Sequence, residues 1–400
     1  MPLETASRKN GKIRVLHFAG IINRYDIIDS VLTRLDRSRF EVHALTGVPP
    51  RQTGAYTSAE AYPTRCLNME FSRRRYPQMY HALMEEIRRV RPHILQAHHF
   101  DENVVAAWAV RRARVPCYII GRHYSDHIYY LTRGLKRKMF LAAEGFSNRT
   151  ANRIAVPAQD IARLLTERQG VPREKIEVIP FGLDFKKYHP STPEAPERLR
   201  REFGLEDSFM ALACCRLNPE KGLEYLLQAV PRIKARVENF KLVFVGDGPR
   251  EDELRRLSRE LGINNAVQFV GWRDDALDWV AAADAVVQPS FCESFCQVLM
   301  EALAFGKPMV MTPVGAAPDV IGRDERGLIV PAGDAHAIAE ALTRLAENRR
   351  LGAELGARGQ AYIRENLAAD VTTRRYEQLY ETALQEASAG DARLAEGLSL

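Results

Sequence analysis

The sequence predicts an α/β protein with two domains, each built on a parallel sheet. Its 400 residues, 46% of them hydrophobic, suffice for two buried cores. Strand and helix signals alternate to about residue 180 and resume at residue 209, which is typical of parallel sheets. The two halves also differ in charge: residues 1–190 hold 32 Lys and Arg against 18 Asp and Glu, a net +14, whereas the remainder holds 25 against 33, a net −8.

The composition argues against a membrane-spanning, a secreted or a metal-binding protein. No run of about 18 apolar residues is present, so a membrane-spanning helix is not expected. Residues 1–12 are polar and lack the apolar segment of a signal peptide. The six cysteines, at positions 66, 117, 214, 215, 292 and 296, follow no metal-binding or disulfide-framework spacing. We therefore expect a cytoplasmic protein without a metal site.

In the first half, predicted strands end at residues that can meet a ligand. Residues 12–19 form a buried strand followed by Gly20, a helix fits 27–35, and 40–46 is a second strand. Two later strands end at His98 and His123. Because open parallel sheets bind ligands at the carboxyl ends of their strands, both rings are candidates for bonding a sugar hydroxyl or a phosphate. A structural loop histidine is the alternative for each.

Basic and aromatic residues cluster at 73–76 and 129–140. Such clusters fit an anionic membrane surface or an anionic acceptor, and solvated helix faces are the alternative. Nucleic acid fits less well, because no recognised binding motif accompanies the charge.

After a proline-containing linker at 186–197, the second half presents two cations. The buried strand that begins at residue 209 ends near Arg216 and Lys221. Two cations five residues apart at a strand's carboxyl end can neutralise a diphosphate, and surface solvation is the alternative. Trp272, after a later strand, is a candidate for ligand contact, and structural packing is the alternative.

Residues 286–306 predict a strand, a tight turn and a helix that Ser294 caps. Glu293 then precedes the helix and Glu301 lies within it. Eight helical residues span roughly 12 Å, whereas paired glycosidase carboxylates lie about 5 to 9.5 Å apart. The spacing favours one extended ligand touched at two points, with the helix N-terminus facing a diphosphate. Two unrelated glutamates are the alternative.

This segment resembles the E-x7-E motif of retaining glycosyltransferases of family 4, which have the GT-B fold. The family pattern is P-S-x-x-E-G-F-G, and residues 289–296 read P-S-F-C-E-S-F-C, with Ser294 and Cys296 in the glycine positions. Arg216 and Lys221 match the family's G-R-L…K-G pattern, and residues 312–319 resemble a later turn whose amides approach the sugar or phosphate.

The resemblance implies a GT-B fold, in which two facing Rossmann-like domains border an interdomain cleft. It implies an acceptor-binding domain at 1–186 and a nucleotide-sugar-binding domain at 197–370. A helix at 371–388 would return to the first domain, and we expect a disordered tail at 389–400.

The resemblance also implies metal-independent hexose transfer from a nucleotide-diphosphate sugar, with UDP or GDP as the nucleotide and with retention of configuration. The acceptor would be a glycan, a lipid-linked glycan or a small molecule, as in polysaccharide biosynthesis, and the protein could be peripheral to the membrane. Glu293 would orient the hexose, Glu301 the ribose, His123 the sugar and His98 the acceptor side. The donor-binding residues would be Arg216, Lys221, Glu301, Gly20, Ser294, Phe295 and Trp272.

Two other functions remain open. A sugar-nucleotide epimerase of the same fold would turn over without an acceptor. A donor-binding regulator without activity would bind without turnover, and Ser294 and Cys296 in the glycine positions keep that alternative open.

Overall fold

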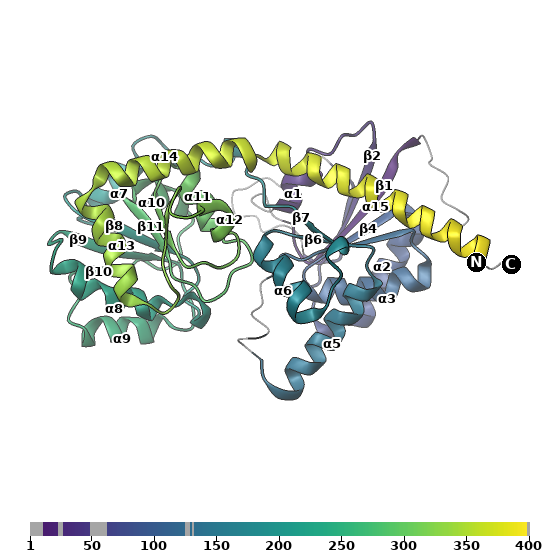
Figure 1. Cartoon of the computed structure of the whole chain (residues 1–400), viewed down its shortest axis with the longest axis horizontal. Helices are drawn as coiled ribbons and strands as arrows, with labels where there is room; N and C mark the ends of the chain where they lie inside the picture. The colour runs from purple at the N-terminus through teal and green to yellow at the C-terminus, as the bar shows by residue number, and fades with distance from the viewer. Residues whose placement is uncertain (1–10, 23–26, 49–61, 125–128, 130–131, 398–400) are drawn as a thin grey trace. The chain divides into compact units, whose positions relative to one another are not determined.

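The computed structural model describes residues 11–22, 27–48, 62–124, 129 and 132–397, with side chains up to residue 389. The chain divides into two compact units (Figure 1). The first unit comprises residues 1–182 and 369–400, and the second unit comprises residues 183–368.

The first unit contains a parallel sheet with the strand order β3-β2-β1-β4-β5-β6-β7. Every residue of β1 is buried, as expected for a parallel strand covered on both faces. The strands predicted from the sequence at 12–19, 40–46, 93–99 and 116–123 are β1, β2, β4 and β5. The strand bounds are β1 Ile13–Ala19, β2 Phe40–Thr46, β3 Thr64–Cys66, β4 Ile94–His98, β5 Cys117–Gly121, β6 Arg153–Val156 and β7 Ile176–Val178.

Helices flank this sheet, and the last of them comes from the far end of the chain. Tyr376, Leu379, Tyr380 and Ala383 of α15 are buried in the hydrophobic core that β1 and β2 also form. Burying a large apolar side chain contributes about 1.5–3 kcal/mol, so these residues attach α15 firmly to the first sheet. The helices of the first unit are α1 Ile27–Leu32, α2 Tyr76–Val90, α3 Phe100–Ala113, α5 Gly134–Thr150, α6 Gln159–Gln169 and α15 Ala369–Gly397, with 3-10 turns η3 Arg73–Arg75 and η4 Arg173–Lys175.

The expected disordered tail at 389–400 differs from the structure. Helix α15 continues to Gly397, and residues 398–400 lie outside the described residues. The sequence from 392 to 396 reads A-R-L-A-E, all of them good helix formers. The helix therefore extends beyond the last residues that pack on the sheet.

The second unit contains a parallel sheet with the order β10-β9-β8-β11-β12-β13. Its core joins residues of β8, β9 and β11 to apolar faces of α8 and α13. The strands are β8 Phe209–Cys214, β9 Phe240–Val245, β10 Val267–Phe269, β11 Ala285–Gln288, β12 Met309–Met311 and β13 Leu328–Ile329. The helices are η5 Phe185–Lys187, α7 Ala195–Glu202, η6 Pro219–Lys221, α8 Leu223–Lys234, α9 Glu251–Glu260, α10 Ala276–Ala282, α11 Gln297–Ala304, α12 Ala317–Ile321, α13 Ala335–Glu347 and α14 Arg349–Asn366.

The segment expected to be a linker, 186–197, belongs to the second unit. The backbone N–H and the hydroxyl of Ser191 both donate to the buried carboxylate of Asp278, at 2.6 Å each, and Ala195 is fully buried. Prolines in this segment therefore mark an ordered connection that the second unit holds by hydrogen bonds.

A buried ion pair joins the residue that follows β5 to α5 in the first unit. The side chains of Arg122 and Glu144 are only 1% and 2% exposed, and the guanidinium donates to Oε1 of the carboxylate. Tyr124 Oη and Gln169 Nε2 also donate to Glu144, at 2.8 and 2.7 Å. Removing one partner of such a pair leaves an uncompensated buried charge.

We predict that Glu144→Gln destabilises the first unit by about 3–5 kcal/mol, because Arg122 loses its counter-charge. The control is Glu85→Gln, whose pair with Arg65 is exposed and contributes about 0–1 kcal/mol. Hydrogen exchange of the α5 amides under increasing urea measures both. Equal exchange in the two variants would contradict the prediction.

Candidate functional site

The second sheet reverses its strand order between β8 and β11. From β8 the chain adds β9 and β10 on one side, and it then returns to place β11 on the other side. The loops that follow these two strands therefore diverge at the carboxyl edge, where open α/β sheets bind ligands. Arg216 and Lys221 lie on the loop after β8, and Glu293 lies on the loop after β11.

An ion pair connects the two loops. Lys221 Nζ lies 2.7 Å from Oε1 of Glu293, and the two side chains are 18% and 11% exposed. Ser290 Oγ also donates to Oε1, at 2.7 Å, and itself accepts from Gln288 Nε2. Burial alone would lower the pKa of Lys221, but the Glu293 carboxylate outweighs it and raises that pKa. Lys221 is therefore a fixed cation at this edge.

Glycines let the loops approach closely. Gly222 has φ +63°, and a Cβ there would lie 2.4 Å from the carbonyl oxygen of Pro289. Gly315, at φ +57° in the turn 312–319, would place a Cβ 3.0 Å from the carbonyl oxygen of Glu293. Three loops thus meet around Glu293, and the turn 312–319 lies beside the predicted site residues.

The start of α11 corrects one prediction. Ser294 does not cap the helix: α11 begins at Gln297, and Cys296 occupies the N-cap position with φ +76° and ψ +92°. A non-glycine residue in that region costs of order 1–3 kcal/mol, which explains why the family pattern has glycine there. The turn between β11 and α11 is therefore longer than hydrophobic periodicity indicates. Phe295 is buried, and Ser294 is partly exposed.

The other predicted donor-binding residues of the second unit lie on the loops that follow β8 and β10 and on helix α11. Arg216 is exposed, and no described residue forms an ion pair with it. Glu301 on α11 accepts from Gln297 Nε2 at 2.9 Å, and burial raises the pKa of its carboxyl to about 7. Trp272 is 65% exposed beside Gly271, so it does not serve core packing.

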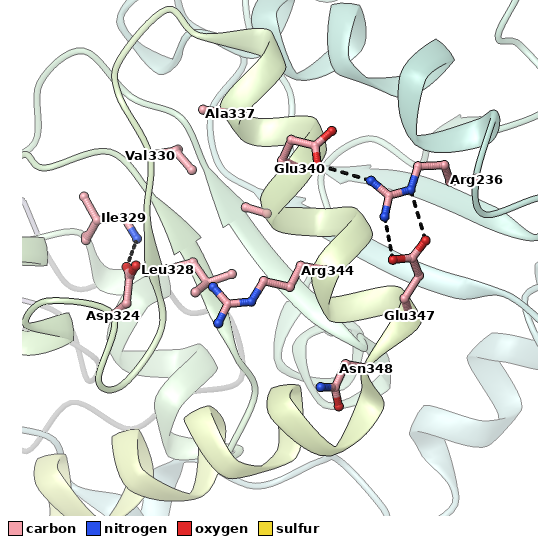
Figure 2. Close-up of a pocket in the computed structure, with 11 residues that line it drawn as sticks. Arg236, Asp324, Leu328, Ile329, Val330, Ala337, Glu340, Arg344, Glu347 and Asn348 are labelled. Carbon is pink, nitrogen blue, oxygen red and sulfur yellow. Dashed lines mark hydrogen bonds and ion pairs between the residues drawn. The ribbon is translucent and has the colours of Figure 1, made fainter.

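A pocket elsewhere in the second unit does not suit a diphosphate (Figure 2). It measures about 520 Å³ and lies between β13 and α13. Arg236 there is paired with both Glu340 and Glu347. With Arg344 and Asp324, the lining holds two cations against three anions, and none of the predicted site residues lines it.

The first sheet reverses its order between β1 and β4, and histidines cluster there. His17 Nδ1 lies 3.0 Å from His98 Nε2, and His98 Nδ1 lies 2.8 Å from His123 Nε2. Burial lowers the pKa of His17 and of His123 to about 3, and that of His98 well below its usual range. All three rings are therefore neutral at physiological pH.

The hydrogen bonds of His98 differ from its predicted role on the acceptor side. Both of its ring nitrogens are bonded to other histidines and its side chain is buried, so its ring cannot also bond an acceptor. The His123 residue is partly exposed, whereas its Nδ1 is itself buried and has no hydrogen-bond partner among the described residues. Of the two predicted catalytic histidines, His123 is thus the one with an unpartnered ring nitrogen.

Gly20 is also engaged within the first unit. Its N–H donates to Glu102 Oε1 at 2.6 Å, and its carbonyl accepts from the amides of Gly47 and Val48. Burial raises the pKa of Glu102 to about 8. The predicted contact between the Gly20 amide and a donor phosphate is therefore not available in this arrangement. Residues 23–26 of this loop lie outside the described residues.

Several site residues escaped the sequence prediction. His17 and Gln96 are buried polar residues within mostly apolar strands, and the sequence pattern could have identified them by that contrast. Tyr380 and Glu102 carried no such signal, since each lies in an ordinary helical pattern.

Within the described residues no group of three or more His, Cys, Asp or Glu is arranged to hold a metal ion, and no described helix is long and apolar enough to cross a bilayer.

Two family models match consecutive parts of the chain. Residues 27–187 match Glycosyltransferase Family 4, and residues 196–362 match Glycosyl transferases group 1. Over 197 residues the chain is 32% identical to a Corynebacterium glutamicum protein named GDP-mannose-dependent monoacylated alpha-(1-6)-phosphatidylinositol monomannoside mannosyltransferase, covering 47% of this chain and 51% of that protein. Over 289 residues it is 28% identical to the lipopolysaccharide core biosynthesis glycosyltransferase LpsD of Rhizobium meliloti, covering 70% and 76%. The chain spans about half the length of the curated relatives that it matches most strongly.

Solved structures show the same architecture. Anabaena HepE in complex with UDP-glucose superposes with a TM-score of 0.77 at 21% identity, covering 92% of this chain and all of that one. Sucrose-phosphate synthase from Thermosynechococcus elongatus has a TM-score of 0.76 at 20% identity, covering 94% of this chain and all of that one. These likenesses confirm the predicted GT-B fold class.

We predict that acid selectively destabilises the first unit. An unfolded histidine has a pKa of about 6.5, whereas the folded His17 and His123 have pKa values of about 3. Below about pH 6.5 the unfolded chain binds protons that the folded unit does not, so the free energy of unfolding falls as the pH drops toward 3. Each ring should contribute about 1.4 kcal/mol of loss between about pH 7.5 and 5.5.

Hydrogen exchange of the β1 and β4 amides at the two pH values measures this loss. His17→Gln should reduce the pH dependence by about one ring's share, and His81→Gln, at an exposed position, should not change it. The same pH dependence in all three proteins would refute the explanation.

Proposed function

Because the chain belongs to family 4 of the glycosyltransferases, we propose that it transfers a hexose from a nucleotide-diphosphate sugar to an acceptor. The proposed transfer retains the anomeric configuration and needs no catalytic metal. The observation that carries the proposal is the Lys221–Glu293 pair at the strand-order reversal of the second sheet. It places a fixed cation and a carboxylate together at the edge where a sheet of this kind binds its ligand.

The cations supply the electrostatic part of the mechanism. As the bond between sugar and phosphate breaks, negative charge develops on the leaving diphosphate. Arg216, which has no ion-pair partner among the described residues, and Lys221 are proposed to stabilise that charge. The N-terminus of α11 adds its partial positive charge. Preorganised groups of this kind need no reorganisation during the reaction.

The glutamates orient the two sugars of the donor. Glu293 Oε1 already accepts from Lys221 and Ser290, while no described residue bonds its Oε2, which is left for a hexose hydroxyl. Glu301 is proposed to bond the ribose hydroxyls. Its carboxyl has a pKa of about 7, so it can accept a hydrogen bond when ionised and donate one when protonated.

No protein nucleophile is required in this proposal. The departing phosphate oxygen takes the proton of the acceptor hydroxyl on the face from which it leaves, and the new glycosidic bond forms there. His123 is proposed to bond a hydroxyl of the transferred sugar, as the resemblance implies. An exposed Trp272 is proposed to stack on the nucleobase.

The nucleotide is proposed to be UDP or GDP. One relative is named as GDP-mannose-dependent, and HepE was crystallised with UDP and with UDP-glucose. Both names concern those proteins, and they select the first donors to test.

We predict that one nucleotide sugar raises the melting temperature of the chain and that Glu301→Ala abolishes this shift, because the ribose loses its partner. The panel comprises UDP-, GDP- and ADP-sugars. Glu340→Ala, on an exposed face of α13, is the control. A shift that survives in Glu301→Ala would remove the ribose role, and no shift with any donor would remove the enzyme proposal.

Turnover then separates the alternatives. Formation of a glycosylated product only when an acceptor is present would support the transferase. Conversion of the sugar without an acceptor would identify an epimerase, and binding without turnover would identify a donor-binding regulator.

The acceptor side is proposed to approach an anionic membrane. Helix α5 exposes Leu135 and Met139, at 73% and 65%, next to the exposed Lys136 and Lys138. Trp108 of α3 is 61% exposed. Apolar side chains among lysines are the pattern of a surface that lies on lipid head groups.

We predict that the chain binds anionic vesicles more tightly than neutral ones and that salt weakens this binding, because the Debye length is only about 10 Å at 0.1 M. The double variant Leu135→Ser/Met139→Ser should bind less at every salt concentration. Sedimentation with vesicles provides the measurement. Equal binding to neutral and anionic vesicles would exclude a membrane role for this surface.

A further inference from the structure

A continuous row of hydrogen bonds runs from α15 through the first sheet to His123. Tyr380 Oη donates a short hydrogen bond to Gln96 Oε1 and lies 3.4 Å from His17 Nε2. His17 Nδ1 meets His98 Nε2 at 3.0 Å, and His98 Nδ1 meets His123 Nε2 at 2.8 Å. Four segments of the chain, β1, β4, α15 and the residues that follow β5, thus contribute to one network.

Neutral imidazoles allow only two proton arrangements in such a row. Each neutral ring has one N–H donor and one bare nitrogen acceptor. Each contact between two rings needs one proton, so the choice made at one end passes through all three rings. Either every ring donates toward Tyr380, or every ring donates toward His123. The low pKa values of the three rings support their neutral state.

The Tyr380 end decides between the two arrangements. A tyrosine hydroxyl has a single proton. The Gln96 amide is oriented in this structure with Oε1 toward Tyr380, and in that orientation the proton is given to Gln96 Oε1. Its oxygen can therefore only accept from His17 Nε2. His17 Nδ1 must then accept from His98, and His98 Nδ1 must accept from His123. The proton of His123 lies on Nε2, and its Nδ1 is a bare acceptor with no partner among the described residues.

We propose that Gln96, Tyr380, His17 and His98 are positioning residues that hold His123 in the tautomer with a bare Nδ1. This acceptor is buried in this structure, so the bound sugar must uncover it before a sugar hydroxyl donates a hydrogen bond to it. The identity of the ligand rests on the proposed function, whereas the tautomer rests on the hydrogen bonds alone. A bare nitrogen attracts a hydroxyl proton and repels a carboxylate. The site therefore takes a sugar with a hydroxyl at the position that faces His123, and it rejects a uronate or a deoxy sugar there.

The surrounding residues pack closely around the contact between His98 and His123. A Cβ on Gly121 would lie 2.6 Å from His98 Nδ1 and 2.8 Å from His123 Nε2, the two atoms that share a proton. Any larger residue would push the rings apart. His123 also packs against the rings of His99 and Phe181, with centroids 5.6 and 5.4 Å away, which restrict its rotation.

The test reads the protonation of each ring nitrogen by nuclear magnetic resonance on the full chain labelled with ¹⁵N-histidine, without any ligand. His123→Asn identifies the His123 signals by their loss. We expect the wild type to have a protonated Nε2 and a bare Nδ1 at His123. A protonated Nδ1 in the wild type would overturn the proposal whether or not the protein is a glycosyltransferase.

Three variants then test how the tautomer is set. Gln96→Met leaves His17 as the only described acceptor for the Tyr380 proton, so the row should reverse and His123 Nδ1 should become protonated. Tyr380→Phe removes the hydroxyl that selects one proton arrangement, so both tautomers of His123 should be populated. Tyr118→Phe, which loses a buried hydroxyl that donates to the Asn103 carbonyl outside the row, should leave His123 unchanged. An unchanged His123 tautomer in both Gln96→Met and Tyr380→Phe would overturn the proposal.

A binding measurement tests the consequence for the ligand. The wild type should bind a nucleotide hexose at least 10-fold more tightly than the corresponding nucleotide uronate, and Gln96→Met should reduce this ratio. Equal affinity of the wild type for the two donors, with a bare Nδ1 confirmed, would overturn the ligand part of the proposal. Binding of neither donor would count against the proposed function instead, since the spectrum does not depend on it.

Discussion

The ion pair between Lys221 and Glu293 is the constraint on which the second unit's site depends. It joins two loops that leave neighbouring strands in different directions, and its atoms are mostly shielded from water. A charge pair of this kind stabilises little compared with apolar packing, but removing one partner costs about 3–5 kcal/mol. The pair therefore matters mainly because it fixes the positions of the two side chains, and Gly222 and Gly315 allow the loops to meet.

In the first unit, neutral side chains rather than an ion pair are held in position at the strand-order reversal. Its sheet also reverses strand order, between β1 and β4, and the polar residues there are buried histidines in place of an ion pair. Burial keeps these rings uncharged, so hydrogen bonds rather than charges fix their orientation. The arrangement requires α15, because Tyr380 ends the row. The C-terminal helix thus contributes to the site as well as to the core of the unit.

Much of this fold follows from local sequence. Strand and helix alternation predicts the parallel sheets, and the positions of Arg216, Lys221 and Glu293 follow from where strands end. The start of α11 does not follow, because hydrophobic periodicity does not register the positive φ of Cys296 that precedes the helix. The role of His98 and the occupied amide of Gly20 depend on partners about 80 residues away, His17 and Glu102, and no local pattern identifies such contacts.

The central claim is that the carboxyl edge of the second sheet binds a diphosphate. The most direct measurement is calorimetric titration of a nucleoside diphosphate and of the corresponding nucleoside into the wild type and Arg216→Gln. Arg216 is exposed and has no ion-pair partner among the described residues, so the variant should keep its fold. A charged hydrogen bond contributes about 1.5–3 kcal/mol, so the variant should bind the diphosphate about 10-fold or more weakly and bind the nucleoside unchanged. Equal affinity of both proteins for the diphosphate would contradict the claim.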